Sequence, residues 1–254
     1  MTSRYIELTR ELASREIKVR YKQSILGYAW VILNPLAQML VMAFVFSHII
    51  RFPDLGVPYT LFLYTGLLPW NLMTSSLNTA TNSLVENRSL LSKVYFPREI
   101  FVISTLTAKI VDFTLASTVL VLFMLYYGTP ITWHILWLLP ILIIQELFTF
   151  GLALLLSSCN LFYRDIQYLL TLILTIWMYL TPVIYPVELM PGSYRWIFQA
   201  NPMAVLLNAY RQVILSGSTP NLSSLGIALV VSLLLAWVGY RIFKKLEGVF
   251  ADVI

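Results

Sequence analysis

The chain has 254 residues, of which 59% are hydrophobic and only 11% are charged, against roughly a quarter charged in an ordinary soluble domain. A soluble core cannot bury that much apolar surface, so the composition predicts an all-α integral membrane protein with one membrane domain. The net charge of +5 does not indicate nucleic-acid binding, because the basic residues cluster between apolar runs. A single cysteine, Cys159, excludes a disulfide framework.

Six apolar runs are candidates to cross a bilayer core, which takes about 20 residues of helix. They cover residues 29–50, 58–80, 100–127, 133–158, 166–185 and 222–243. The second run is rich in Ser, Thr and Asn and is the weakest candidate. Most Lys and Arg residues lie in the N-terminal segment, the second and fourth loops and the C-terminal end, so both termini are expected in the cytoplasm.

Residues 2–22 have the periodicity of an amphipathic helix lying on the membrane, within an interface segment 1–24. Glu16 breaks the pattern, because it falls near the centre of the apolar arc. The helix is either a simple interfacial anchor or a surface that binds a partner.

Residues 84–99 form a charged, amphipathic segment between the second and third runs, on the expected cytoplasmic side. None of the ten glycines is followed by Lys-Ser or Lys-Thr, so the chain lacks a P-loop and any ATP work must come from another chain. We interpret the segment as the element to which that separate ATPase binds. The residues expected to couple to it are Glu86, Asn87, Arg88, Lys93, Phe96, Pro97, Arg98 and Glu99.

Two cytoplasmic loops end alike, with Phe-Pro-Arg-Glu-Ile at 96–100 and Phe-Tyr-Arg-Asp-Ile at 162–166. In each, an acid at a helix start suits the positive end of the helix dipole and can cap free N–H groups. The similarity indicates either two independent helix starts or two related docking points, which would add Arg164 and Asp165 to the coupling residues.

Residues 182–220 are interrupted by five prolines and are too short to span. They are expected to form a re-entrant or interfacial hairpin on the outer face, with one short helix at 203–215. The final segment, 244–254, is expected to be a cytoplasmic tail that follows a membrane domain of residues 25–243.

Three charged residues lie well inside the predicted spans, away from the span ends. Lys109 and Asp112 share a helix face and can pair, and Glu146 is expected to reach Lys109 or a polar residue of the second span. They form either a buried ion pair that fixes packing or a proton relay. With two histidines and one cysteine, a metal centre is not expected, and no bound cofactor is predicted for this chain.

Many aromatic residues fall at predicted interfaces, as in an ordinary aromatic belt. Others lie in the spans beside amides, and aromatic faces pack on sugar rings while polar groups bond the hydroxyls. These residues predict a translocation path that lets a glycan slide: Tyr28, Trp30, Asn34, Gln38, Trp70, Trp177 and Tyr179.

The motifs together resemble the membrane subunit of ABC-2-type exporters of lipid-linked polysaccharide, which export O-antigen, capsule or teichoic acid. The resemblance extends from about residue 15 to 215, and the joint order of the motifs makes it specific. It rests on Arg20-Tyr-Lys-Gln-Ser-Ile-Leu-Gly27, Trp30, Pro35, Gly66, Trp70, Asn87, Lys93, Phe96-Pro-Arg-Glu99, Arg164-Asp165, Pro182-Val-Ile-Tyr-Pro186, Asn201-Pro202 and Arg211.

The resemblance implies a homodimer of this chain in a bacterial plasma (inner) membrane, joined to two ABC ATPase subunits that hold ATP and Mg. It places Leu26 and Gly27 in a cytoplasmic gate loop, near Arg20 and Lys22 for the lipid head group. Residues 84–99 become the coupling helix, and spans one and five line the channel between the copies. The hairpin 186–215 becomes the outer gate, formed with Tyr185, Pro186, Tyr194, Trp196, Asn201, Pro202 and Arg211.

Three alternatives remain at this point. The first is an ABC-2 exporter of a small lipid or drug. The second is a membrane-embedded enzyme of glycan or lipid assembly, and the third is a proton-coupled secondary transporter. The enzyme would require clustered acids or histidines, which the chain offers only scattered, and the secondary transporter would work without an ATPase.

Overall fold

The computed structural model describes residues 2–22, 24–50, 56–91, 97–187 and 192–250, and these contain helices but no strand. The long elements are α1 (Thr2–Tyr21), α2 (Ala29–Phe44), α3 (Tyr59–Glu86), α5 (Ile100–Tyr126), α6 (Leu138–Phe162), α7 (Ile166–Leu180), α9 (Pro202–Ile214) and α10 (Leu222–Glu247). The short ones are the π-helix η1 (Val45–Ile50), α4 (Arg88–Leu91), the 3₁₀ turns η2 (Trp133–Trp137) and η4 (Gly192–Tyr194), and α8 (Arg195–Ala200).

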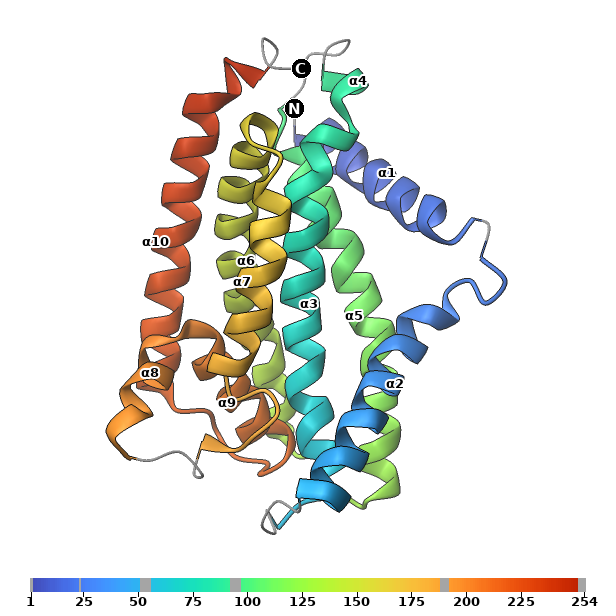
Figure 1. The fold of residues 1–254 in the computed structure, drawn as a ribbon, viewed down its shortest axis with the longest axis vertical. Helices are drawn as coiled ribbons and strands as arrows, with labels where there is room; N and C mark the ends of the chain where they lie inside the picture. Colours follow the sequence, from blue (N-terminus) through green and yellow to red (C-terminus); the bar gives the residue numbers. More distant parts are fainter. Residues whose placement is uncertain (1, 23, 51–55, 92–96, 188–191, 251–254) are drawn as a thin grey trace.

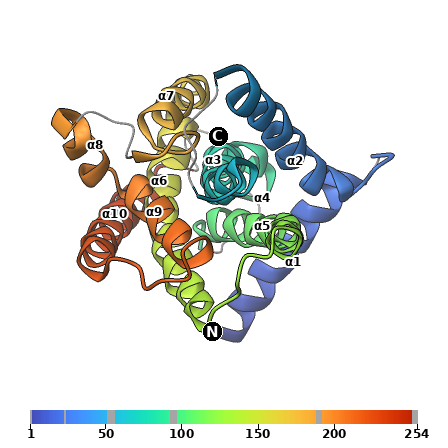
Figure 2. The same ribbon diagram turned by 90° about the horizontal axis from the view of Figure 1, so that it is seen from below.

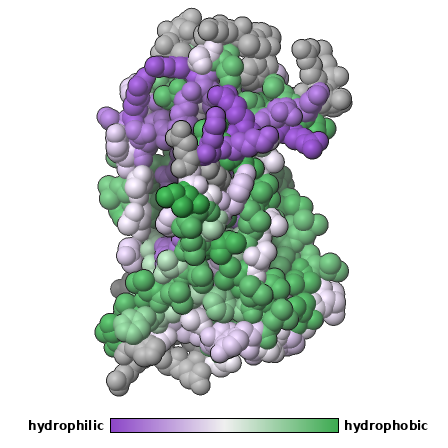
Figure 3. Space-filling view, turned by 90° about the vertical axis from the view of Figure 1, so that its right-hand side faces the viewer, coloured by the Kyte–Doolittle hydropathy of each residue, from purple (hydrophilic) through white to green (hydrophobic). Residues whose placement is uncertain are grey.

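The helices form a bundle around α3, which packs against α2, α5, α6, α7 and α9 (Figure 2). The start of α1, the short α4 and the C-terminal end of α10 gather at one end, which we call the α4 end (Figure 1). The helices α8 and α9 lie at the opposite end, the α9 end. Helix α1 slants away from the bundle toward the loop that leads into α2, and its face carries a hydrophilic band above a mainly hydrophobic surface (Figure 3).

Four of the six predicted spans are confirmed as helices long and apolar enough to cross a membrane: Ala29–Ser47, Ile100–Tyr126, Trp133–Phe162 and Leu222–Glu247. The second predicted span lies in α3, which has 28 residues but is not apolar enough to meet that measure. The reason is physical: α3 is packed among other helices, so its Ser, Thr and Asn side chains lie against protein or line a polar cavity. The fifth lies in α7, an apolar helix whose 15 residues are fewer than expected.

Helices α6 and α10 are packed backbone to backbone through two glycines. A Cβ atom added to Gly239 would lie 2.4 Å from the carbonyl oxygen of Gly151, and one added to Gly151 would lie 2.6 Å from the backbone of α10. Small residues allow this approach, which is how membrane helices gain van der Waals contact without a hydrophobic driving force. The pair α6–α10 therefore forms one close-packed unit.

Local capping explains where the later helices begin. Asn201 caps α9 by accepting a hydrogen bond from the backbone N–H of Met203 at 3.1 Å, and Asn221 caps α10 in the same way from Ser224 at 3.1 Å. The expected helices at 2–22 and 203–215 are thus confirmed as α1 and α9. The predicted caps of α5 and α7 are wrong: Glu99 and Asp165 occupy the N-cap positions, but their helical φ and ψ leave their side chains without a cap bond.

Candidate functional site

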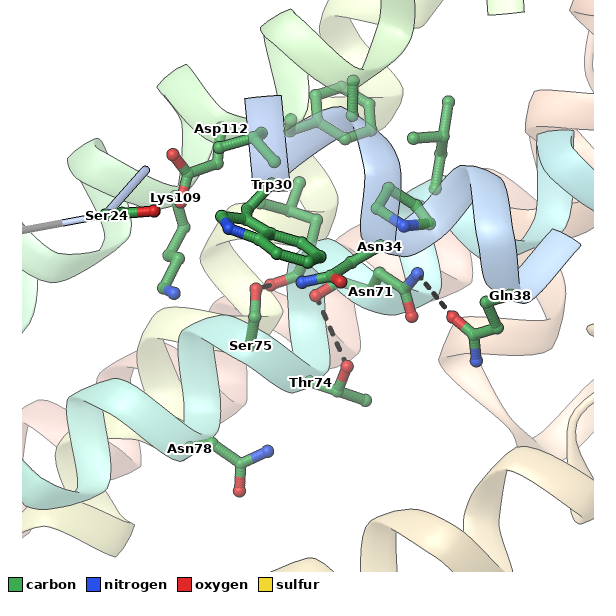
Figure 4. A pocket seen from close by; sticks show the side chains of 16 residues that line it. Ser24, Trp30, Asn34, Gln38, Asn71, Thr74, Ser75, Asn78, Lys109 and Asp112 are labelled. Atoms are coloured by element: carbon green, nitrogen blue, oxygen red, sulfur yellow. Dashed lines mark hydrogen bonds between the residues drawn. The ribbon is translucent and has the colours of Figure 1, made fainter. Parts of the chain in front are cut away.

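A polar cavity of about 610 Å³ lies between α2, α3 and α5 (Figure 4). It is walled by amides and hydroxyls at the depth of apolar helices, a position where exposed polar groups are tolerated only beside protein or water. Its lining consists of Ser24, Trp30, Val31, Asn34, Pro35, Gln38, Leu68, Asn71, Leu72, Thr74, Ser75, Asn78, Lys109, Asp112, Phe113 and Ala116.

One hydrogen bond joins the two sides of the polar cavity. The Asn71 amide of α3 donates to the Gln38 side-chain oxygen of α2 at 3.2 Å (Figure 4). The Thr74 hydroxyl bonds back to the carbonyl of Trp70 at 3.1 Å. The side chain of Asn78, on the same face of α3, also lines the cavity. The Lys109 and Asp112 side chains of α5 reach the same cavity, so both signs of charge are present there.

Five of the seven predicted path residues fall into two groups, while Tyr28 lines a different cavity and Tyr179 is exposed. Trp30, Asn34 and Gln38 line the polar cavity, and Trp30 is 44% exposed. Trp70 does not line it: its ring is 2% exposed and packs edge-on against Trp177 at a centroid distance of 5.9 Å. These two tryptophans are packing residues within the chain.

A polar stripe on one face of α3 lines the cavity and was not predicted from the sequence. Asn71, Thr74, Ser75 and Asn78 recur at the three- and four-residue spacing of one helix face, and all four line the cavity. That spacing is the signal that would have found Thr74 and Ser75.

The expected partnership of Glu146 with Lys109 is wrong. Among the described residues neither carboxylate oxygen of Glu146 has a hydrogen-bond partner, and Lys109 faces the polar cavity instead. Glu146 lies on α6, close enough to Tyr210 of α9 for the two to interact electrostatically.

The loop between α1 and α2 presents apolar side chains to the surroundings. Gly27 has a φ of +50°, which favours glycine, and its N–H donates to the Ser24 hydroxyl at 3.1 Å. Ile25 is fully exposed and Leu26 is 48% exposed. Lys22 is also exposed, whereas the side chain of Arg20 lies outside the described residues. The predicted gate loop therefore projects from the bundle and exposes apolar side chains at its tip.

Part of the predicted coupling segment is available to a partner at the α4 end. Its exposed members are Glu86, Arg88 and Pro97, while Asn87 is half-buried and bonds back to the carbonyl of Ser83 at 2.9 Å. Arg164 and Asp165 are exposed at the same end, between α6 and α7. Lys93 and Phe96 lie outside the described residues.

Arg98 and Glu99 are bound to the C-terminal end of α10. Lys244 lies 2.8 Å from the Glu99 carboxylate and 2.9 Å from that of Glu247. The Arg98 backbone N–H donates to the Glu247 carboxylate at 3.1 Å, and its guanidinium donates to the Glu247 carbonyl. We call these four residues the α5–α10 clamp. Because it joins the end of the coupling segment to the last helix, the clamp can transmit a displacement between them.

The segment that contains α8 and α9 is fastened by Arg211 to the end of α7 and to α3. This buried guanidinium donates to the carbonyls of Pro182 and Val183 at 2.6 and 2.7 Å and stacks 3.7 Å from the Phe62 ring centroid. A Cβ atom at Gly66 would lie 2.6 Å from the Arg211 guanidinium, so only glycine at this position leaves room for the arginine side chain. Arg211, predicted for the outer gate, is therefore a buried packing residue.

Further bonds tie the end of α7 to the hairpin. Asn201 accepts from the Trp177 indole at 3.3 Å and donates to the Thr181 hydroxyl at 2.9 Å, and the Tyr185 hydroxyl donates to the Tyr179 carbonyl at 2.7 Å. Trp196 is 65% exposed, and Pro186 is buried while Pro202 starts α9. The side chain of Tyr194 lies outside the described residues.

Comparison with known proteins places this architecture in a family. The model of the ABC-2 type transporter family matches residues 7–215, so the chain belongs to that family and is a membrane transport component. The chain is 33% identical over 245 residues to an O-antigen export system permease protein, RfbA, of Klebsiella pneumoniae, covering 96% of this chain and 93% of the relative.

Two further relatives extend the comparison. An O-antigen export system permease protein RfbA of Myxococcus xanthus is 32% identical over 252 residues, covering 98% of this chain and 96% of the relative. The polysialic acid transport protein KpsM of Escherichia coli is 22% identical over 249 residues, covering 92% and 91%. Both matches cover nearly the whole of each chain.

Proposed function

We propose that this chain is the transmembrane permease subunit of an ATP-driven exporter that moves lipid-linked polysaccharide of the O-antigen, capsule or teichoic-acid type across the inner membrane. The observation that carries the proposal is the match along nearly the full length to permeases named for O-antigen export. The polar cavity between α2, α3 and α5 supports it, because a transported glycan requires amides and hydroxyls at membrane depth.

We further propose six spans with both termini in the cytoplasm. At 1.5 Å per residue the 28 residues of α3 extend about 42 Å, more than the roughly 30 Å hydrocarbon core. The 15 residues of α7 extend about 23 Å, and the chain that follows them to the Arg211 anchor supplies the remaining depth. The hairpin of α8 and α9 is then re-entrant from the outer face, and the α4 end is cytoplasmic.

A homodimer would complete the path. Helices α2 and α7 both pack on α3 and lie on the same side of it (Figure 2), so a second copy facing them would enclose a channel. Exposed apolar side chains on both helices support a contact there. Those of α7 are Leu169, Leu172, Ile173, Ile176 and Leu180, and those of α2 are Leu33, Leu40, Val41 and Phe44.

Two copies of an ABC ATPase, holding ATP and Mg, would supply the energy through the α4 end. ATP-driven closure of the ATPase pair displaces residues 84–99, and the α5–α10 clamp moves α10 together with the α6 to which it is packed. Helix α2 is then released from α3, the loop at Leu26 and Gly27 opens, and the lipid-linked glycan passes along the polar stripe. Such rigid-body shifts of packed elements are an ordinary means of switching.

The test is transport by the reconstituted complex. The chain is co-expressed with the ATPase that co-purifies with it, and inverted vesicles are supplied with lipid-linked polysaccharide and ATP. The proposal expects ATP-dependent accumulation of the polysaccharide inside, abolished when the ATPase is inactivated. Transport of small lipids alone would establish the alternative exporter. Glycan turnover by the chain without any ATPase would establish the enzyme.

A further inference from the structure

A second cavity, larger than the polar one, lies in the groove between α1 and α5. It has a volume of about 850 Å³, and its walls are almost wholly apolar. Helix α1 contributes Ile6, Ala13 and Ile17, and α5 contributes Ile103, Val111 and Leu115. Tyr28, from the loop that leads into α2, completes the lining. We call this cavity the α1–α5 groove.

The groove has the depth of one leaflet. Ile103, Thr107, Val111 and Leu115 follow one another at four-residue intervals on α5 and so form a single stripe. Twelve residues of helix extend roughly 18 Å, close to half of the roughly 30 Å hydrocarbon core. The length fits the acyl chain of a lipid in one leaflet.

The charged side chains that line the groove are basic. They are Arg10 and Lys18, and the carboxylates of the same helix, Glu7 and Glu11, are not part of the lining. Among the described residues, neither Arg10 nor Lys18 has a carboxylate within salt-bridge distance. Both cations belong to α1, the helix that presents a hydrophilic band above the apolar surface in Figure 3. An anionic group at this level would be complementary to them.

We infer that the α1–α5 groove is a binding site for an anionic phospholipid of the leaflet that contains α1. One acyl chain lies along the α5 stripe under α1, and the phosphate faces Arg10 and Lys18. Because Tyr28 forms part of the wall, the lipid supports the loop that carries Leu26 and Gly27 and sets its resting position. The site does not depend on which substrate the transporter exports.

The experiment measures retained lipid. The full chain, in complex with its ATPase, is reconstituted in vesicles of phosphatidylcholine and phosphatidylglycerol in equal parts, re-extracted, and analysed by native mass spectrometry. We expect phosphatidylglycerol to be retained in preference to phosphatidylcholine. Val111→Trp fills the groove and should remove the retained lipid. Val121→Trp is the control, because Val121 is equally exposed on α5 (44% against 41%) but lies outside the groove.

A second pair of variants tests the charge. Arg10→Gln should lower the affinity for phosphatidylglycerol about fivefold, the effect of one basic residue at a membrane surface. Arg15→Gln, on the same helix but outside the groove, removes the same charge and should leave retention unchanged. Equal retention by all four variants, or equal retention of phosphatidylcholine and phosphatidylglycerol, would overturn the inference. None of these outcomes bears on the ATP-driven transport assay.

Discussion

The two sides of this protein are held together in different ways. On one side, α6 and α10 meet through Gly151 and Gly239, and Arg211 fastens α9 to the end of α7. On the other, α1 and α2 are joined by a projecting loop, and the buried residues of α2 are only Met39 and Ala43. The first side, the α6–α9–α10 block, has the packing of a rigid body. The second, the α1–α2 arm, exposes apolar and polar groups that require lipid, substrate or a second copy.

The difference indicates where motion is possible. A close-packed pair of helices cannot separate without losing backbone contact along its length, so the block moves as a unit. The arm is connected to α3 by the Gln38–Asn71 hydrogen bond across a polar cavity, and such a bond between membrane helices contributes only about 0.6 kcal/mol. We therefore expect the arm to move relative to α3. We expect the block to transmit the displacement that begins at the α4 end.

The largest effect is expected from filling the glycine contact of the block. Gly239→Leu forces a side chain against the Gly151 carbonyl, and because backbone cannot yield cheaply we expect loss of most folded protein. Gly226→Leu is the matched control, since a Cβ atom at Gly226 meets nothing within 4 Å. Folded yield by size-exclusion chromatography measures both. Similar yields for the two variants would show that the block is not close-packed.

Removal of the Arg211 anchor should destabilise the protein by about 3 kcal/mol, because two buried carbonyls lose a charged donor. Arg211→Lys should recover only part of this, since one ammonium cannot reproduce the planar pair of hydrogen bonds. Thermal unfolding of Arg211→Ala, with the exposed Arg241→Ala as control, provides the measurement. An unfolding temperature equal to that of the control would return Arg211 to a role in gating.

The α5–α10 clamp should affect coupling more than stability. Lys244→Ala removes ion pairs that are partly exposed, so we expect a stability loss of about 1 kcal/mol or less. The amount of polysaccharide exported per ATP hydrolysed should nevertheless fall, because the coupling segment loses its connection to α10. Lys245→Ala is the control, being exposed on the same helical turn. An unchanged export ratio in Lys244→Ala would remove the clamp from the mechanism.

The smallest change in stability is expected in the arm. Trp30→Ala alters a half-exposed side chain and should shift the free energy of unfolding by less than about 0.5 kcal/mol. Export should slow, because Trp30 lines the polar cavity. Trp133→Ala, at an exposed position outside the cavity, is the control. Equal export by the two variants would place Trp30 among the lipid-facing aromatics.

Much of the fold was predictable from hydrophobic periodicity, because a membrane span is a local property of about 20 residues. The helices α1, α2, α5, α6, α9 and α10 follow from it. Trp30, Asn34 and Gln38 were predicted as path residues because aromatic and amide side chains occur together there, and all three line the polar cavity. Hydropathy does not identify α3 as a span, because a helix packed among other helices can carry polar side chains. The break that Glu16 makes in the apolar arc of α1 also has a tertiary cause: its carboxylate accepts a hydrogen bond from Thr105 of α5 at 3.0 Å.

The contacts between distant segments were not predictable. Glu99 and Lys244 are 145 residues apart, and nothing in either segment indicates the other. Arg211 was assigned to the outer gate by the family resemblance, but its buried guanidinium donates to the carbonyls of the irregular backbone at 182–183. The position of Trp70 was likewise not predictable. An aromatic residue beside amides can line a path or pack in a core, and its tertiary neighbours decide which.

The most direct test of the central claim is to lock the arm to α3. In a Cys159→Ser background, Gln38→Cys and Asn71→Cys place two thiols across the polar cavity, where the native side chains are 3.2 Å apart. A short, cleavable thiol cross-linker is applied to the complex with its ATPase, and ATP-dependent polysaccharide export is measured before and after reduction. Export should stop in the cross-linked complex and return when the link is cleaved. Full export by a completely cross-linked complex would contradict the proposal that the arm moves relative to α3.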